Sequence, residues 1–269
     1  MSSKSVLSVK NLSVSFSQYV KGLKQKIITP IGCLNIDLKA GEVHAVIGAS
    51  GSGKSLLAHA VLGILPSNAI CSGTMDYMGE PLTEKRIKQL RGKEIAFIPQ
   101  SVNYLDPLMK VGKQIKIGLP KESASKTEAQ LLQQYGLKQG DKERYPFELS
   151  GGMLRRILFA TSVREGVKLV IADEPTPGIH PEALSAILNQ LRAFADEGAS
   201  VMLITHDIVS ALSISDRVTV LREGEAIETV DVDCFHGKGE KLSHPYTKAL
   251  WRSLPTNEFT LYQEVKLCH

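Results

Sequence analysis

Residues 48–55, with the sequence GASGSGKS, carry the strongest chemical signal in the chain. They match the pattern GxxxxGK[ST] between a predicted strand and a predicted helix, which is the context of a phosphate-binding loop rather than of a glycine-rich turn that merely starts a helix. Glycines let successive N–H groups point inward, and the helix N-terminus adds partial positive charge. We expect Lys54 to reach the terminal phosphates of a nucleotide and Ser55 to bind Mg²⁺. The residues expected to contact the nucleotide are Gly48, Ser50, Gly51, Ser52, Gly53, Lys54 and Ser55.

Two adjacent carboxylates follow another apolar run, at residues 169–172. Because neighbouring residues of a strand point to opposite faces, Asp173 is expected to face the magnesium shell. Glu174 is expected to address the water that attacks the last phosphate. An acidic pair at a solvent-facing strand end is the alternative, and the phosphate loop favours the catalytic interpretation.

A second glycine-containing motif, LSGGM at residues 149–153, opens a predicted helix. Ser150 is a good N-cap, and Gly151 and Gly152 expose unpaired N–H groups, so a capped helix is the structural interpretation. The functional interpretation is a second anion site. A chain with a phosphate cradle and a separate helix-terminus anion site makes sense if each cradle is closed by the helix end of another chain.

The composition is that of a globular protein. The 269 residues are 43% hydrophobic and 22% charged, which excludes disorder and collagen-like structure. No apolar stretch approaches the ~20 residues of a membrane helix, and the first residues lack the apolar block of a signal peptide, so we expect the chain to stay in the cytosol. The four cysteines are isolated and predict reduced thiols. Cys234, His236 and His244 fit no standard zinc spacing.

The elements that must position the motifs alternate between strands and helices. Strands are expected at residues 7–16, 33–38, 43–47, 74–78, 95–98, 169–172, 201–204 and 218–221. Helices are expected at residues 54–65, 127–135, 153–163 and 182–195, the first with Leu57, Val61 and Ile64 on one face. This order predicts a parallel sheet covered on both faces, with ligands at the carboxyl ends of its strands.

Taken together, the motifs resemble those of the ATP-binding cassette ATPases, whose paired nucleotide-binding domains sandwich two ATP molecules. GASGSGKS resembles the Walker A motif, LVIADE the Walker B motif and LSGGM a variant of the LSGGQ signature. Gln100 matches the Q-loop glutamine and His206 the switch histidine, which implies catalytic roles for both beside Glu174. The resemblance also implies Gln100 as a Mg²⁺ ligand, together with Ser55 and Asp173.

The family anatomy implies an α/β P-loop NTPase (RecA-like) fold: a mostly parallel sheet core, an N-terminal antiparallel β subdomain and an inserted helical subdomain. One ATP-binding domain is expected over residues 1–225, with the helical subdomain at about 101–164, and a tail over residues 226–269. Phe16 stands where the family places an aromatic under adenine, although core packing explains it nearly as well. Residues 101–116 are expected to help form a groove for a coupling helix of a membrane partner, with a buried loop as the alternative. The expected groove residues are Tyr104, Leu105, Pro107, Leu108 and Met109.

The subgroup is suggested by YPFELSGGMLRR at residues 145–156 and HPYTKAL at residues 244–250. Both resemble the ATPase subunits of oligopeptide, dipeptide and nickel importers. Many peptide members carry a cysteine cluster after this segment, and its absence here favours nickel or a metal chelate over peptides as the transported solute.

The implied cofactors are ATP and Mg²⁺. The implied partners are a second ATPase subunit, two transmembrane permease subunits and, indirectly, an extracytoplasmic solute-binding protein, without nucleic acid, at the cytoplasmic face of the membrane. A soluble cassette ATPase of repair or translation is the alternative, and a single-chain P-loop kinase is less favoured because it needs neither LSGGM, Gln100 nor His206.

One position departs from the family pattern. The loop after the Walker B motif usually ends in Asp, whereas His180 stands here. Because this loop crosses the dimer interface, the missing carboxylate is expected to weaken communication between the two sites or hydrolysis at one of them. Glu174 and His206 are both present, which argues against an inactive site.

Overall fold

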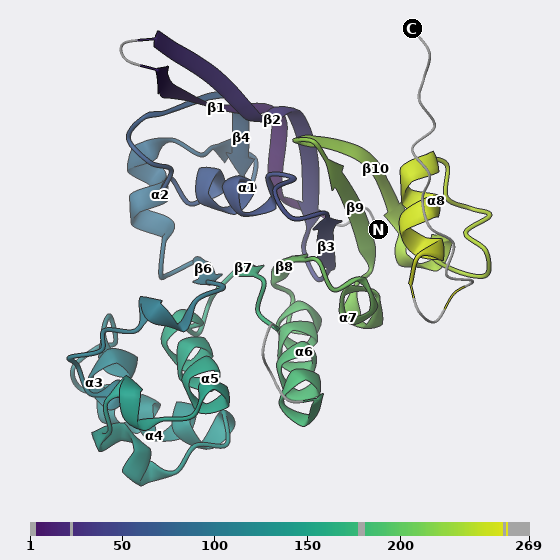
Figure 1. Cartoon of the computed structure of the whole chain (residues 1–269). Coiled ribbons are helices and arrows are strands. Elements are labelled where there is room, and N and C mark those ends of the chain that lie inside the picture. The colour runs from purple at the N-terminus through teal and green to yellow at the C-terminus, as the bar shows by residue number, and fades with distance from the viewer. Residues whose placement is uncertain (1–3, 22–23, 177–180, 255–256, 258–269) are drawn as a thin grey trace, which may run out of the picture.

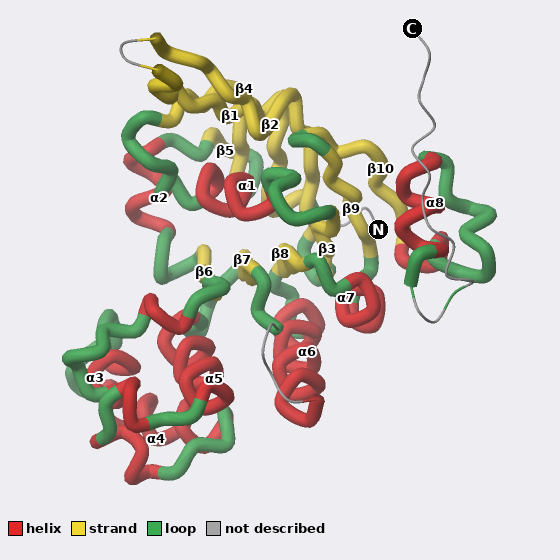
Figure 2. Tube along the Cα trace, viewed as in Figure 1, coloured by secondary structure: helices red, strands yellow, loops and turns green. Residues whose placement is uncertain are grey.

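Two β-sheets organise the molecule (Figures 1 and 2). The computed structural model describes residues 4–21, 24–176, 181–254 and 257. The antiparallel sheet has the strand order β2-β1-β4-β5, formed by β1 (Ser5–Lys21), β2 (Lys24–Lys39), β4 (Ala69–Tyr77) and β5 (Glu80–Pro81). The second sheet has the order β10-β9-β3-β8-β7-β6, formed by β3 (Val43–Gly48), β6 (Ile95–Ile98), β7 (Leu169–Asp173), β8 (Ser200–Thr205), β9 (Arg217–Arg222) and β10 (Glu225–Asp231).

All neighbours in the six-stranded sheet are parallel except β10, which pairs antiparallel with β9. Figure 1 shows α1 (Lys54–Val61) and α2 (Glu84–Leu90) between the two sheets, and α6 (Pro181–Asp196) and α7 (Ile208–Ile214) on the other side of the six-stranded sheet. Strands covered on both faces are near-continuous apolar runs, and β3, β7 and β8 are buried along their whole length.

The two faces of these strands belong to different cores. Val46 and Ile204 pack with α1 and the antiparallel sheet, whereas Ile47 and Leu203 pack with α6 and α7. Because side chains alternate along a strand, one short apolar run supplies both layers. The carboxyl ends of the parallel strands are thereby held rigidly at one edge of the sheet.

A helical subdomain is inserted between β6 and β7. It contains α3 (Val111–Lys116), α4 (Ala124–Gln134) and α5 (Gly151–Ser162), which share a separate core (Figure 1). Beyond β10, α8 (Pro245–Arg252) packs beside the six-stranded sheet. The predicted combination of a mostly parallel sheet, an antiparallel β subdomain and inserted helices is confirmed.

Several predicted boundaries were wrong. The helix expected at residues 54–65 ends at Val61 because Gly63 adopts the left-handed conformation (φ 60°) that terminates helices, which leaves Ile64 exposed rather than on the buried face. The strand expected at residues 33–38 is the end of the longer β2. The six-stranded sheet includes β10, which ends at Asp231, and the domain boundary expected near residue 225 stays a prediction.

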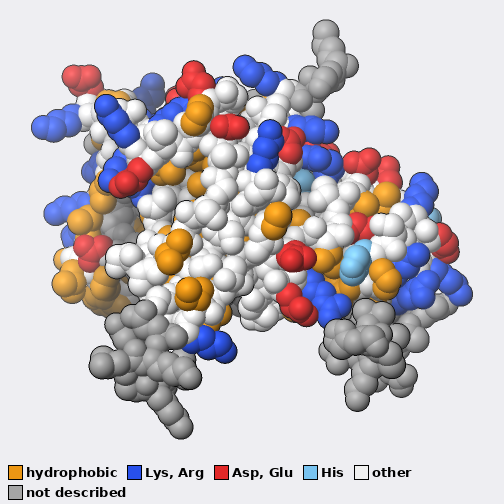
Figure 3. Space-filling view, turned by 90° about the horizontal axis from the view of Figure 1, so that it is seen from above, with side chains coloured by type: hydrophobic (Ala, Val, Ile, Leu, Met, Phe, Trp, Pro, Cys, Tyr) orange, Lys and Arg blue, Asp and Glu red, His pale blue; other side chains and the backbone are white. Residues whose placement is uncertain are grey.

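The surface over the antiparallel sheet carries both signs of charge. Seen from above, Lys and Arg side chains lie interspersed with Asp and Glu side chains over the part of this face that is described (Figure 3). Over the described residues, every helix is too short or too polar to span a membrane.

Candidate active site

The loop between β3 and α1 depends on glycine at two positions. A Cβ on Gly48 would lie 2.2 Å from the carbonyl oxygen of Leu221, inside the neighbouring strand β9. Gly53 has φ 97°, and a Cβ there would lie 2.9 Å from the carbonyl oxygen of Pro30. Both residues therefore let the backbone turn tightly from the end of β3 into α1, as the phosphate-loop prediction requires.

Lys54 folds back over this loop. Its ammonium donates to the carbonyl oxygens of Gly48 (2.8 Å) and Ala49 (2.9 Å). Burial lowers the pKa of the ammonium, while the nearby carboxylates of Glu174 and Asp173 raise it. The backbone thus holds the Lys54 ammonium at the mouth of the loop. A phosphate group bound there would stabilise the charged form of this ammonium.

Ser52 brings an unsatisfied hydroxyl to the same loop. Its side chain is buried, and its Oγ has no hydrogen-bond partner. A buried polar group without a partner costs roughly 1–3 kcal/mol, so native structures rarely keep one without a reason. The loop is therefore suited to an anion that accepts this hydrogen bond, and the residues present fit the phosphates of ATP.

Ser55 and Asp173 meet from different elements. The hydroxyl of Ser55, on α1, donates to Oδ1 of Asp173, at the end of β7, over 3.1 Å. Burial raises the pKa of Asp173, the hydrogen bond from Ser55 lowers it, and the charge of Glu174 raises it again. Hydroxyl and carboxylate oxygens are hard donors of the kind that Mg²⁺ prefers, so this pair fits that ion.

Glu174 follows β7 with an unusual backbone. Its φ is 45°, in the left-handed region, and its N–H donates to the carbonyl oxygen of Ile204 over 2.8 Å. Its carboxylate accepts hydrogen bonds from Thr205 Oγ1 (3.1 Å) and His206 Nδ1 (2.8 Å). A non-glycine residue in this conformation stores strain that the surrounding contacts must hold. The carboxylate is therefore fixed in direction by two neighbours, Thr205 at the end of β8 and His206 directly after it.

Thr205 is a site residue that the sequence interpretation missed. Its hydroxyl donates to Glu174 and accepts from the N–H of Asp207 over 3.0 Å. The only signal in the sequence is a polar residue at the end of an apolar strand, directly before His206. That pattern is common at strand ends and identifies no partner.

One cavity of about 470 Å³ gathers most of the predicted residues. This volume lies within the roughly 300–1,000 Å³ of small-molecule sites. The loop and the Glu174–His206 pair both border it, together with Gln100 from the segment after β6. Its lining residues are Ser50, Gly51, Gly53, Lys54, Ser55, Leu56, Gln100, Glu174 and His206.

The structure does not bring the LSGGM residues to this cavity. Ser150 caps α5, with its Oγ accepting from the N–H of Met153 over 3.4 Å, as the N-cap prediction expects. Ser150 and Gly151 are exposed, and neither they nor Gly152 are among the described residues that line the cavity. If they contact a nucleotide, it is one held by another molecule.

Phe16 lies in the antiparallel sheet. It is half-buried, packs against the core beneath that sheet and pairs across the strands with Ile28 and Ala69. It is not among the described residues that line the cavity. Its contact with adenine stays a prediction beside the packing role that these contacts establish.

The expected groove residues divide into exposed and buried ones. Tyr104 (61%) and Leu108 (85%) are exposed, whereas Leu105 (4%) belongs to the core of the helical subdomain. Leu105 therefore does not line an open groove, which corrects that part of the prediction. His180 lies outside the described residues.

The Cys234, His236 and His244 cluster serves the tail. His244 caps α8, its Nδ1 accepting from the N–H of Tyr246 over 3.1 Å. Cys234 packs against the core shared with α6 and α7. No group of three or more His, Cys, Asp and Glu residues is placed to hold a metal ion within the described part of the chain.

Known proteins are similar to this chain in sequence and in fold. The family model described as ABC transporter matches residues 32–177. The oligopeptide transport ATP-binding protein OppD of Bacillus subtilis is 35% identical, over 97% of this chain and 75% of that protein. The oligopeptide transport ATP-binding protein AmiE of Streptococcus pneumoniae is 33% identical, over 93% of this chain and 72% of that protein.

Solved structures agree on the fold. The dimeric ATP-binding cassette MJ0796, bound to ADP and Pi, superposes with a TM-score of 0.72 at 24% identity, covering 84% of this chain and 98% of that one. The structure of cbiO1 from Clostridium perfringens, part of the complex cbiONQ, gives a TM-score of 0.69 at 28% identity, covering 86% of this chain and 90% of that one.

Proposed function

The chain belongs to the ABC transporter family, and on that premise we propose that it binds and hydrolyses ATP for an importer of oligopeptides or dipeptides. Membership in this family makes it an ATPase subunit. The finer parts of the proposal are the roles of individual residues, the metal ion, the partner subunits and the transported solute.

One observation carries the residue assignments. The phosphate loop with its unpaired Ser52 hydroxyl, the Ser55–Asp173 pair and the Glu174–His206 pair converge on one edge of the sheet. These groups come from separate segments of the chain, and a parallel sheet places the carboxyl ends of its strands together. A structural role for each group alone would not require Lys54, Ser55, Glu174 and His206 to border one cavity.

We assign the phosphate contacts to the loop. Its N–H groups, the hydroxyl of Ser52 and the ammonium of Lys54 bind the β- and γ-phosphates and offset the charge that develops on them. Ser55, Asp173 and Gln100 are the residues that would hold Mg²⁺, which neutralises phosphate charge when it is bound. Lys54 leaves its carbonyl partners Gly48 and Ala49 to contact the nucleotide.

Glu174 is placed to direct hydrolysis. Its carboxylate accepts a proton from the attacking water as the new oxygen–phosphorus bond forms and the bond to the departing ADP oxygen breaks. The hydrogen bonds from Thr205 and His206 keep the carboxylate aimed into the cavity. His206 is itself largely exposed, so it is accessible to a facing subunit as well.

The site is completed by a second subunit in this proposal. The N-terminus of α5 offers unpaired N–H groups from Gly151 and Gly152 and lies apart from the chain's own cavity. One terminal phosphate cannot dock against two helix ends of a single molecule when α1 already begins at Lys54. The dimeric form of the cassette MJ0796 supports this arrangement.

Peptides are the solute that the relatives favour. Both relatives described above are named for oligopeptide transport, and another, DppD of Lactococcus lactis, for dipeptide transport. The preference for nickel or a metal chelate, drawn from the missing cysteine cluster, stays a prediction. Two permease subunits and a solute-binding protein complete the proposed importer, with exposed Tyr104 and Leu108 offered to a permease at the membrane.

Two variants test the site directly. Lys54→Ala should abolish most ATP-induced stabilisation of the isolated chain, which is about 2.7 kcal/mol at 100 times the Kd.

Gly152→Asp should change ATP affinity of the isolated chain less than about threefold, ~0.7 kcal/mol, while it abolishes hydrolysis by the assembled importer. Equal damage to binding and hydrolysis by Gly152→Asp would place the whole site within one chain.

The transported solute is tested by identifying the membrane proteins that co-purify with the chain and by measuring uptake. The chain should co-purify with two multispanning membrane proteins, and cells that carry them should take up labelled di- and oligopeptides in a manner that requires Lys54. Uptake of nickel without peptide uptake would decide for the metal. Absence of membrane partners would favour the non-transport alternative.

A further inference from the structure

Arg155 joins the helical subdomain to the segment that carries Gln100. It lies on α5, and its Nη1 donates to the carbonyl oxygens of Pro99 (3.1 Å) and Gln100 (2.6 Å). Pro99 and Gln100 directly follow β6 of the six-stranded sheet. The contact therefore ties the helix that starts with the LSGGM motif to the backbone of a residue that borders the ATP cavity.

This arginine is buried without a counter-charge. Its exposed fraction is 6%, and burial lowers the pKa of its guanidinium. No carboxylate among the described residues forms an ion pair with Arg155, whereas the partly buried Arg217 is paired with Glu42. A desolvated charge normally needs such a partner. The acceptors of its guanidinium among the described residues are the backbone carbonyl oxygens of Pro99 and Gln100.

Arg155 lies in the second turn of α5. A neutral side chain of similar length would pack there without the cost of burying a charge. The arrangement is therefore better explained by what Arg155 holds than by the stability of α5.

We propose that Arg155 is a positioning residue that fixes Gln100 relative to the N-terminus of α5. Gln100 and the N–H groups of Gly151 and Gly152 then move as one body when the helical subdomain moves against the sheet. Gln100, which would help to hold Mg²⁺, thereby keeps its place relative to the N-terminus of α5 when this helix docks on the partner subunit. This inference rests on the proposed function, in which both elements contact ATP or its metal ion.

Arg164 provides a matched control. Burial also lowers the pKa of its guanidinium. The guanidinium also donates to backbone carbonyl oxygens, those of Ala160, Val163 and Ile115. All three acceptors belong to the helical subdomain. Arg164→Met therefore removes a partly buried guanidinium without touching the segment that carries Gln100.

The test measures how ATP hydrolysis by the assembled importer depends on Mg²⁺. Arg155→Met should raise the half-saturating Mg²⁺ concentration and lower kcat, each about tenfold, the factor that about 1.4 kcal/mol gives, with KM for ATP changed less than about twofold. Arg155→Lys should recover part of both losses because its ammonium still donates to a carbonyl oxygen. Arg164→Met should leave the Mg²⁺ dependence unchanged even if it lowers the Tm.

A double variant shows whether Arg155 acts through Gln100. Gln100→Ala should have its full effect on Mg²⁺ dependence in the wild type and less than about twofold further effect beside Arg155→Met. The inference would be overturned if the effects of Gln100→Ala and Arg155→Met on the Mg²⁺ dependence multiply. It would also be overturned if Arg155→Met leaves this dependence unchanged, as Arg164→Met is expected to do. If Arg155→Met does not fold, an unchanged Mg²⁺ dependence in Arg155→Lys decides against it. If the wild-type importer shows no ATP hydrolysis that requires Lys54, the proposed function itself is refuted.

Discussion

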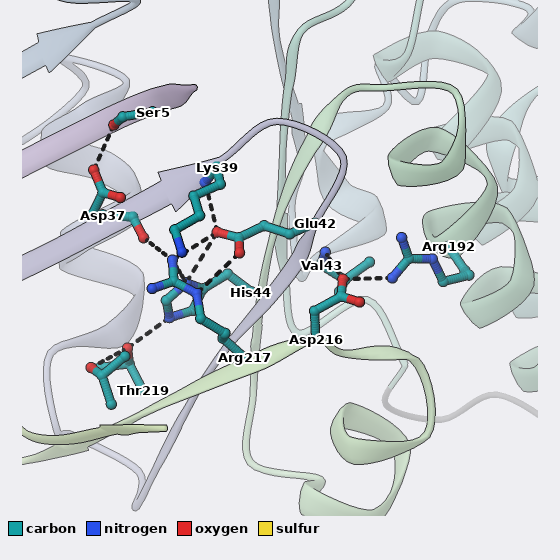
Figure 4. Close-up of polar contacts among 11 residues, drawn as sticks. Ser5, Asp37, Lys39, Glu42, Val43, His44, Arg192, Asp216, Arg217 and Thr219 are labelled. Atoms are coloured by element: carbon teal, nitrogen blue, oxygen red, sulfur yellow. Dashed lines mark hydrogen bonds and ion pairs between the residues drawn. The ribbon is translucent and has the colours of Figure 1, made fainter. Parts of the chain in front are cut away.

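The two ends of strand β3 hold polar clusters of opposite character. Before its first residue, the Glu42 carboxylate accepts from Arg217 Nη2 (2.8 Å) and Nε (3.0 Å), as Figure 4 shows. Beside them His44, which is fully buried, contacts Thr219 Oγ1 over 2.7 Å, and Thr219 continues to Thr229 over 2.8 Å. Every charged group of this cluster has its counter-charge or hydrogen-bond partner inside the protein.

At the other end of the strand the partners are incomplete. The hydroxyl of Ser52 has none, and the ammonium of Lys54 bonds to backbone carbonyl oxygens rather than to a carboxylate. Glu174 is held in a strained backbone and faces a cavity. Burial alone therefore does not distinguish the two clusters. What distinguishes them is that Glu42 and Arg217 pair with each other inside the protein, whereas Lys54 and Glu174 border a cavity that suits a ligand.

The closed cluster should dominate stability. Arg217→Met leaves the buried Glu42 carboxylate unpaired, and breaking a buried pair typically destabilises a protein by about 3–5 kcal/mol. We expect a loss of that size in the free energy of unfolding, measured with urea, and an ATP affinity within about twofold of the wild type well below the Tm. Arg217→Met combined with Glu42→Gln should recover part of the loss. A fall in affinity that matches the fall in stability would mean that the two ends of β3 are coupled.

Acid should weaken the closed cluster. Burial raises the pKa of Glu42, but hydrogen bonds from His44, Arg217 and the N–H of Lys39 outweigh it and lower the pKa from 4.5 to about 2. A depressed carboxylate pKa stabilises the fold above pH 4.5 and loses this effect as the pH falls towards 2. The shift corresponds to about 3 kcal/mol. Urea unfolding at several pH values should show the advantage of wild type over Glu42→Gln shrinking in that interval; a constant advantage would contradict the assignment.

The open end should dominate catalysis instead. Glu174→Gln keeps the shape of the side chain and removes the carboxylate that takes the proton, so hydrolysis by the importer should fall at least ~10²-fold, about 2.7 kcal/mol. ATP binding by the isolated chain should persist, and the free energy of unfolding should change less than it does in Arg217→Met. Thr205→Val offers a control that loosens the carboxylate without removing it and should cause a smaller loss. Wild-type hydrolysis by Glu174→Gln would refute the catalytic assignment.

The sequence predicted the open end better than the closed one. Glycine spacing, the lysine and the acidic pair are local patterns beside apolar runs, and residues 48–55, Asp173 and Glu174 lie where strand ends were expected. Glu42 and Arg217 are 175 positions apart, and neither stands in a recognisable motif. Their pairing follows from the neighbouring positions of β3 and β9 in the sheet, which no local pattern encodes.

The misplaced boundaries have similar causes. The antiparallel strand β2 begins at Lys24, well before its predicted start, because register shifts and the residues around Pro30 interrupt its alternation. The sequence did not predict that Arg155 links two segments, because the carbonyl oxygens it contacts lie 55 and 56 positions earlier in the chain. Backbone acceptors are present at every residue, so a sequence cannot say which of them an arginine will find.

The smallest expected effect concerns Ser52, whose hydroxyl should affect ATP binding and protein stability in opposite directions. Removing a hydroxyl that a ligand satisfies should weaken binding, while removing the same hydroxyl from the empty protein should relieve a buried polar group. Ser52→Ala is therefore expected to raise or preserve the Tm without nucleotide and to weaken ATP binding about fivefold, ~1 kcal/mol, by titration calorimetry.

Ser200 supplies the matched control for this prediction. Its hydroxyl, at the start of β8, is equally buried and equally without a partner, but it lies at the opposite end of that strand from Thr205 and the site. Ser200→Ala should raise or preserve the Tm in the same way and leave ATP affinity unchanged. If the two variants shift affinity alike, the unpaired Ser52 hydroxyl is only a packing defect. If they shift stability alike and affinity differently, the unpaired hydroxyl of Ser52 contributes to phosphate binding in addition to its cost in the empty protein.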